Sequence, residues 1–276
     1  MSDQAFAQTL HNFFKTEIYP YVMQCYAVKE VAIQEKSDKE LVSEIDLTIQ
    51  GKVAAFLERT LPGMHLASEE IEASWPPQQD EFVILDPLDG THNFLMGIPL
   101  FGTMFAFIAH GVIEWSTIFL PMEELWGNNG FYFTARGKGS WKYQDNEAIK
   151  LRVSDQKILD RAQVLLEGKS KNVFKSPMAR AIHRSVLRTR NNISMCWSIT
   201  RIASGGLFPS GIDVMVSFDN KPSDNLPGVL FVEEAGGRVS DFSGDTVSLT
   251  QCKSVIFSNG ALHPNLIALG KEAFSG

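Results

Sequence analysis

The chain has 276 residues, of which 44% are hydrophobic and 11% aromatic, so it can bury one large core or two tightly joined halves. Its formal net charge of −7 argues against a general nucleic-acid binder, because that class of protein presents a basic face. Cys25, Cys196 and Cys252 lie far apart and in no CxxC spacing, so we expect reduced thiols in a cytoplasmic protein.

The N-terminal stretch predicts a helix and no targeting signal. It has no basic region followed by an apolar run, and no uncharged apolar run of the chain reaches membrane-spanning length, so we expect no membrane partner. Apolar residues at helical spacing predict a helix over residues 4–27. A second amphipathic helix is predicted over residues 41–63, where Ser43 and Asp46 have the spacing of a capping box.

Short strands dominate the next part of the chain. Two short strands are predicted, MHLAS (64–68) and FVIL (82–85). Glu69 and Glu70 follow the first directly, and Asp86 follows the second. From Leu100 to Ser154 the β-rich runs are broken by Gly, Pro, Asn and charged pairs, which indicates an antiparallel meander. The runs are FGTMFAFIA, VIEWSTIFL, ELWGN, FYFTA, GSWKY and IKLRVS.

Strands and helices alternate after Ser154, which is typical of a mixed α/β half. The predicted strands are AQVLLEG, IDVMVSF, GRVSDF and SVIFSN, and the predicted helices are SPMARAIHRSVLR, KPSDNLPGVLFVEEAGG and HPNLIALGKEAF. No linker rich in Pro, Gly or Ser separates the two halves. We therefore expect residues 1–276 to form one compact unit, with helices and an antiparallel sheet in residues 1–154 and a mixed α/β part in residues 155–276.

The stretch VILDPLDGTHNF (83–94) ends a buried strand on two carboxylates. Asp86 follows the strand directly, at the edge where open α/β sheets commonly bind ligands. Pro87 turns the chain, so Asp89 can fold back beside Asp86, and two such carboxylates repel unless a cation neutralises them. Hard oxygen ligands of this kind, with the Leu88 carbonyl as a further oxygen, suit Mg²⁺.

The residues after Asp89 can serve an anion. Gly90 allows a close approach of the backbone, and a helix that begins at Thr91 would direct free N–H groups at a phosphate. A bare DxxDG motif is nevertheless more often a polar turn with a helix cap, because short motifs have many false positives.

Further acids occupy the ends of other predicted elements. Glu69 and Glu70 follow a short strand, Asp224 begins a helix, and Asp46 lies in a first helical turn. Each has a simpler explanation, a solvated side chain for Glu70 and a helix cap for Asp46. Taken together, the acids favour a metal-dependent site over isolated turns.

Several blocks in the same order resemble the inositol monophosphatase family, which consists of Mg²⁺-dependent phosphomonoesterases. The resemblance covers nearly the whole chain, and the block around Asp86 is highly specific. The blocks are ELVSEID, ASEEI, ILDPLDGTHNF, GIPLFGTMFAFIAHG, TARGKGSW and KPSDNLPGVLFVEEAGGRVSDFSG.

The resemblance implies a role for each matched residue. Thr91 and Asp46 would form a catalytic pair that positions and deprotonates the attacking water, and the N–H groups of Gly90 and Thr91 would hold the phosphate. Glu69 would be both a catalytic residue and a metal ligand. The implied ligands of two or three Mg²⁺ ions are Glu69, Asp86, the Leu88 carbonyl, Asp89 and Asp224.

The resemblance also implies the fold and the assembly. The expected fold belongs to the mixed α+β or α/β class, a layered αβαβα sandwich of the inositol-monophosphatase and fructose-bisphosphatase type. Members are usually homodimers, and lithium inhibits many of them.

Three residues are candidate substrate contacts. Arg201 could meet an acidic group of the substrate, although a surface arginine is the commoner reading, and His92 could touch the phosphate or lie on a helix surface. Ser217 lies seven positions before Asp224, where inositol-specific members of the family carry an acid that reads ring hydroxyls. Ser223 and residues 225–228 depart from the family's pattern, so the direction in which the Asp224 carboxylate points stays open.

We expect a Mg²⁺-dependent phosphatase that hydrolyses a small polyol or sugar phosphomonoester, similar to inositol 1-phosphate, by metal-activated water. One alternative is a histidinol-phosphate phosphatase, because PLFGT is similar to the PLWGT of that group, although HNF departs from its pattern. An alternative of another class is a regulatory partner of the transcription machinery or RNA, against which the acidic charge weighs.

Overall fold

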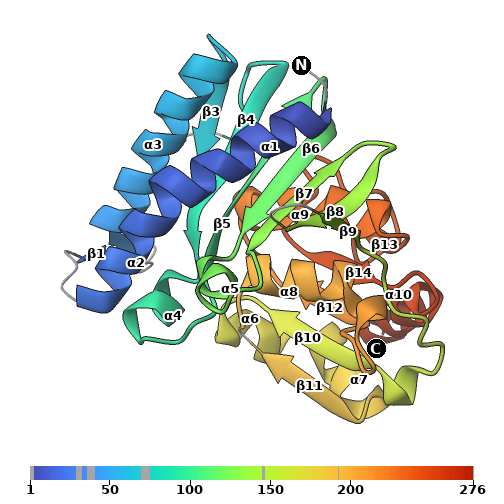
Figure 1. Cartoon of the computed structure of the whole chain (residues 1–276). Helices are drawn as coiled ribbons and strands as arrows, with labels where there is room; N and C mark the ends of the chain where they lie inside the picture. Colours follow the sequence, from blue (N-terminus) through green and yellow to red (C-terminus); the bar gives the residue numbers. More distant parts are fainter. Residues whose placement is uncertain are drawn as a thin grey trace.

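Two large β-sheets alternate with layers of helices (Figure 1). The computed structural model describes residues 3–28, 33–35, 41–69, 75–144, 147–191 and 193–275. Within these ranges no helix combines the length and the apolar character that crossing a membrane requires.

The first sheet has seven strands in the order β3-β4-β5-β6-β7-β8-β9. β3 pairs with β4 in parallel, and all later neighbours are antiparallel, which confirms the predicted meander. The strands are β3 (His65–Ser68), β4 (Glu81–Asp89), β5 (Gly102–Ala109), β6 (Val112–Phe119), β7 (Phe131–Ala135), β8 (Gly139–Tyr143) and β9 (Ala148–Lys150).

The run ELWGN (124–128), predicted as a strand, was wrongly assigned. Its start belongs to helix α5 (Pro121–Leu125), and a turn follows the helix. Pro121 occupies the first helical position, where its fixed φ favours a helix. Glu123 and Glu124 follow in the first turn, where the positive end of the helix dipole favours acidic side chains.

The second sheet has five strands in the order β11-β10-β12-β14-β13. β10 is parallel to both of its neighbours, whereas β14 is antiparallel to β12 and β13. The strands are β10 (Gln163–Glu167), β11 (Arg188–Asn191), β12 (Val214–Ser217), β13 (Arg238–Ser240) and β14 (Val255–Ser258). The sequence analysis missed β11, because this edge strand, RTRN, has no apolar alternation.

Helices of the N-terminal part cover the outer face of the first sheet (Figure 1). Phe14 and Ile49 pack there against Phe105 of β5. The predicted helix over residues 4–27 contains a π-helical turn, and the capping box of Ser43 is confirmed. These elements are α1 (Asp3–Phe13), the π turn (Phe14–Ile18), α2 (Tyr19–Val28), α3 (Glu44–Thr60) and a small sheet of β1 (Ile33–Glu35) and β2 (Leu41–Ser43).

Two helices lie between the sheets and three cover the far side of the second sheet (Figure 1). The central core joins Ile84 of the first sheet, Ile199 of α8 and Phe257 of the second sheet. The layer order is therefore αβαβα, which confirms the predicted fold class. The helices are α6 (Ser170–Lys175), α7 (Pro177–Ser185), α8 (Met195–Ala203), α9 (Pro222–Glu234) and α10 (His263–Ser275), with short 3₁₀ helices at Leu159–Arg161 and Gly205–Leu207.

The end of β4 is shaped by a glycine turn. The pairing of β4 with β5 shifts register between Asp86 and Asp89, and α4 (Thr91–Leu95) begins directly after Gly90. Gly90 has φ +82°, and a Cβ there would lie 2.7 Å from the Leu100 carbonyl oxygen. Only glycine fits this left-handed, crowded position, so the turn holds both aspartates at the beginning of α4.

Candidate active site

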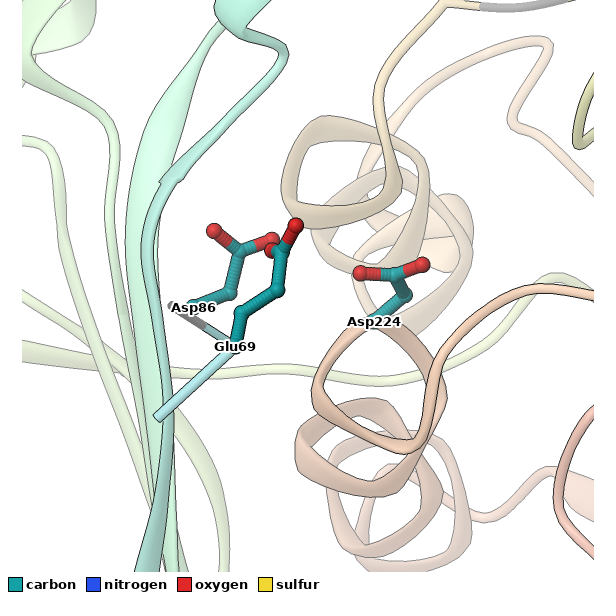
Figure 2. A group of neighbouring side chains, drawn as sticks. All are labelled: Glu69, Asp86 and Asp224. Carbon is teal, nitrogen blue, oxygen red and sulfur yellow. The ribbon is translucent and has the colours of Figure 1, made fainter. Parts of the chain in front are cut away.

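Three carboxylates from three elements converge between the sheets. Glu69 follows β3, Asp86 lies on β4, and Asp224 lies in the first turn of α9. One oxygen atom from each lies within 4.8 Å of one from each of the others. Figure 2 shows Glu69 and Asp86 side by side, facing Asp224 at the start of the helix. The parallel pairing of β3 and β4 explains why two acids so far apart in the sequence end up as neighbours.

The electrostatics of this cluster favour a bound cation. Burial, followed by repulsion from Glu69, Asp89 and Asp224, holds the pKa of Asp86 well above its usual range. Burial and the same kind of repulsion raise the pKa of Asp224, and Lys221 partly offsets this. Buried carboxylates that lie this close together stay ionised when a divalent ion compensates for the water that they have lost. Their hard oxygen atoms are ligands that suit Mg²⁺.

Asp89 is held by the start of α8. Its carboxylate accepts hydrogen bonds from the Ser194 hydroxyl at 2.7 Å and from the N–H groups of Cys196 at 2.8 Å and Met195 at 3.2 Å. Burial raises the pKa of Asp89, whereas these bonds lower it. Asp89 is not one of the three converging carboxylates described above; its carboxylate binds the start of α8.

Thr91 and Asp46 lie close together but are not tightly paired. The Thr91 Oγ1 atom is 3.5 Å from Asp46 Oδ1, at the limit of a hydrogen bond, and it donates to the Leu88 carbonyl at 2.9 Å. The other oxygen of Asp46 accepts from the N–H and hydroxyl of Ser43 at 2.8 and 2.6 Å. Because a hydroxyl has a single proton to donate, Thr91 can serve either Leu88 or Asp46 at one time.

The three candidate substrate contacts have different surroundings. Ser217 is fully buried and accepts a hydrogen bond from the Asn220 amide at 2.9 Å, whereas His92 is exposed on α4. Arg201 is not a surface arginine: its side chain is 18% exposed and pairs with Glu123.

Arg201 belongs to a separate charged group. Glu123 also accepts hydrogen bonds from Tyr132 at 2.7 Å and Lys142 at 2.6 Å. The Arg201 guanidinium lies over the ring of Trp197, 5.1 Å from its centroid. These contacts make Arg201 part of the packing of α8 against the first sheet.

The departures from the family's pattern after Asp224 do not interrupt the helix. α9 continues through Pro227 and Gly228 to Glu234. A Cβ at Gly228 would lie 2.5 Å from the Ile199 side chain, so the missing side chain lets α8 and α9 approach closely. The backbone N–H of Lys221 donates to Asp224 at 2.9 Å and fixes the direction of its carboxylate.

Two charged residues of this region, Lys221 and Glu167, were not predicted from the sequence. Lys221 binds Glu69 across 152 positions of sequence, which no local pattern could indicate. Glu167 is buried and accepts hydrogen bonds from the Ile193 N–H at 3.1 Å and the Ser198 hydroxyl at 2.8 Å. Glu167 could have been found, because it ends an apolar strand as Asp86 does. Glu70, singled out with Glu69, lies outside the described residues.

The chain resembles known proteins over most of its length. The sequence model of the inositol monophosphatase family matches residues 6–273. A Thermotoga maritima protein named fructose-1,6-bisphosphatase/inositol-1-monophosphatase is 26% identical over 234 residues, which is 85% of this chain and 84% of the relative. The Nus factor SuhB of Pseudomonas aeruginosa is 29% identical over 223 residues, which is 78% of this chain and 77% of the relative.

The fold also matches solved structures. A structure of an IMPase/NADP phosphatase complexed with Mg²⁺ and phosphate has a TM-score of 0.78 to this chain at 20% identity, and the match covers 96% of this chain and 95% of that one. Sequence and fold agree over nearly the full length, and the chain belongs to the inositol monophosphatase family.

Proposed function

We propose that this family member is a Mg²⁺-dependent phosphatase of small polyol or sugar phosphomonoesters. The observation that carries the proposal is the convergence of Glu69, Asp86 and Asp224, with oxygen atoms within 4.8 Å of one another. Three carboxylates brought together at the meeting point of two sheets are costly in a folded protein without a compensating ion. Their convergence in this position favours a metal-dependent function over a purely structural one.

The chain offers a complete set of oxygen ligands. Glu69, Asp86 and Asp224 would hold the first cation. Asp89 and the Leu88 carbonyl would supply further oxygen ligands, for a total of two or three ions. When bound, Mg²⁺ neutralises the charge of the phosphate and lowers the pKa of water. The Leu88 carbonyl accepts a hydrogen bond from the Thr91 hydroxyl at 2.9 Å, and its second lone pair would be available to a cation.

The protein's own groups would align the reaction. The N–H groups of Gly90 and Thr91, at the start of α4, would bind phosphate oxygens. Thr91 would orient the attacking water through its hydroxyl and pass a proton to Asp46. The 3.5 Å between Thr91 and Asp46 suits this role, because catalytic hydrogen bonds are often long before the substrate binds.

We propose weak discrimination among substrates. Ser217 stands where an acid would read ring hydroxyls, and its hydroxyl is buried and bound to Asn220. A missing charged hydrogen bond costs about 1.5–3 kcal/mol, which is roughly 10- to 150-fold in specificity. The name of the Thermotoga maritima relative, which joins two phosphatase activities, is compatible with a broad substrate range.

The test is a phosphate-release assay with Mg²⁺ over a panel of phosphomonoesters. The panel contains inositol 1-phosphate, glycerol 2-phosphate, histidinol phosphate and a nucleoside monophosphate. We expect turnover that chelation abolishes, and a preference for inositol 1-phosphate over glycerol 2-phosphate below about a hundredfold. Full activity after exhaustive chelation would contradict the metal-dependent reaction, and a dominant rate with histidinol phosphate would favour that alternative.

The second candidate function is that of a regulatory partner of the transcription machinery. Two relatives, 26% and 29% identical, are named putative Nus factor SuhB and Nus factor SuhB. A pull-down with purified RNA polymerase would separate the two functions, because the phosphatase proposal predicts no retained polymerase. The family resemblance also supports a cytoplasmic homodimer that lithium inhibits. Sedimentation analysis and an assay with added LiCl test the assembly and the inhibition.

A further inference from the structure

Lys221 lies at the carboxylate cluster and binds two of its members. Its ammonium group is 2.8 Å from Glu69 Oε1, and its backbone N–H is 2.9 Å from Asp224 Oδ2. Lys221 directly precedes α9, so the same turn of chain that begins this helix also delivers a positive charge to the acids.

The charge of Lys221 matters because of where its partner lies. An exposed lysine–glutamate pair contributes little to stability, since water screens it. The Glu69 side chain is only 15% exposed, and its carboxylate is one of three within 4.8 Å. The backbone N–H of Lys221 also donates to Asp224 at 2.9 Å, so the residue contacts a second member of the cluster.

We propose that Lys221 is a built-in counter-ion that competes with divalent cations for Glu69. This inference rests on the proposed function in one respect, that the cluster binds Mg²⁺. Magnesium ligates oxygen at about 2.0–2.1 Å, and an ammonium group on the same carboxylate would repel the ion. Lys221 must therefore leave Glu69, or share it at a cost, whenever the cation binds.

Two consequences follow from this competition. In the metal-free protein, Lys221 stabilises the cluster and hence the contact between Glu69 and the start of α9. In the presence of Mg²⁺, the same interaction lowers the affinity of the site. The side chain of Lys221 is 32% exposed, so it has room to swing into solvent when the ion arrives.

Calorimetric titration of the metal-free protein with MgCl₂ tests the inference without any substrate. We expect Lys221→Met to bind Mg²⁺ about tenfold more tightly or better, which corresponds to about 1.4 kcal/mol. The metal-free melting temperature of Lys221→Met should fall, and the rise in melting temperature on adding Mg²⁺ should be larger than in the wild type. Lys221→Arg keeps the charge and should bind Mg²⁺ as the wild type does.

Lys171→Met is the matched control, since Lys171 is an exposed lysine of α6 and the change removes the same charge elsewhere. Mg²⁺ affinity that is unchanged or weaker in Lys221→Met, while the wild type binds the ion, would overturn the competition alone. If neither protein binds Mg²⁺, both this inference and the metal-dependent function fail. Tighter binding in Lys171→Met to the same extent would reduce the effect to net charge and also contradict the inference.

Discussion

The behaviour of single side chains at this site depends on how each carboxylate is compensated. Asp46 has Ser43, Asp89 has the start of α8, and Glu69 has Lys221. Asp86 is 3% exposed and accepts a hydrogen bond from the Leu88 N–H at 3.1 Å, yet burial and repulsion from four neighbouring carboxylates still raise its pKa. A bound cation would supply the compensation that Asp86 lacks.

Asp86→Asn should abolish Mg²⁺-dependent turnover and stabilise the metal-free protein. The substitution removes one charge from a repelling cluster, and each kcal/mol gained raises the melting temperature by about 2–4 °C in a chain of this size class. Thermal melting in EDTA measures the effect. Asp245→Asn, an exposed aspartate, is the control and should leave the melting temperature unchanged. A lower metal-free melting temperature for Asp86→Asn would contradict the repulsion.

Thr91→Ala should lower kcat by about 100-fold or more with a smaller change in KM, because positioned proton transfer typically contributes 10²- to 10⁴-fold. The Thr91 hydroxyl is the group that can reach both Asp46 and the Leu88 carbonyl. Steady-state kinetics with the best substrate of the panel give the two constants. Thr91→Ser keeps the hydroxyl and should restore most of kcat, and an unchanged kcat in Thr91→Ala would exclude the positioning role.

At the scale of elements, the end of β10 positions the start of α8. Glu167 ends β10 and binds the Ile193 N–H and the Ser198 hydroxyl, on either side of the residues that hold Asp89. Burial raises the pKa of Glu167 to about 7, and the hydrogen bonds from Ser198 and Ile193 oppose this rise. The geometry of Asp89 thus depends on a buried acid from a neighbouring strand.

Glu167 should make stability fall as pH rises. The folded protein keeps a proton on Glu167 up to a pH of about 7, whereas the unfolded chain releases it near its ordinary pKa of 4.5. Unfolding therefore releases a proton between these pH values, and the free energy of unfolding decreases by up to about 1.4 kcal/mol per pH unit. Urea unfolding between pH 5 and 8 measures this slope.

Glu167→Gln should flatten that slope, since glutamine does not titrate. The exposed Glu272 of α10 offers the control: Glu272→Gln should show the wild-type pH dependence. Parallel curves for the wild type and Glu167→Gln would show that Glu167 has its ordinary pKa.

At the scale of the whole molecule, the layer formed by α8 and α9 joins the two sheets. The central core contains residues of both sheets and of both helices, such as Ile84, Ile199, Leu230 and Phe257. This shared core supports the proposal that the described residues fold as one unit. Asp86 of β4 and Asp224 of α9 keep their mutual positions because this layer is tightly packed.

Gly228→Ala should test how tight that layer is. The new Cβ would lie 2.5 Å from Ile199 and 3.3 Å from Phe257, so the Ile199 side chain or the helices must shift, at a typical cost of about 1–3 kcal/mol. Urea unfolding measures the loss, and weaker Mg²⁺ binding should accompany it because Asp224 lies at the start of α9. Gly51→Ala, in a helix with open space at that position, is the control and should not destabilise the protein. Equal stability of the wild type and Gly228→Ala would show that the layer can relax.

The sequence by itself determined the local structure around the site. A buried strand ending in Asp86, the glycine turn after Asp89 and the capping box of Ser43 are all written in short-range patterns, because a few neighbouring residues decide backbone conformation. The family motifs added the order of the layers. The polar edge strand β11 and the helix that overlaps ELWGN were not predicted, because their apolar pattern is weak or ambiguous.

Only the tertiary structure decided which side chains meet. Lys221 reaches Glu69, Asp89 turns to α8, Arg201 joins Glu123, and Ser217 is buried beside Asn220. These contacts join residues on different elements, and which elements touch is set by the packing of apolar faces across the whole core. Charged partners are then brought together by that packing rather than by their own spacing, so no local pattern can specify them.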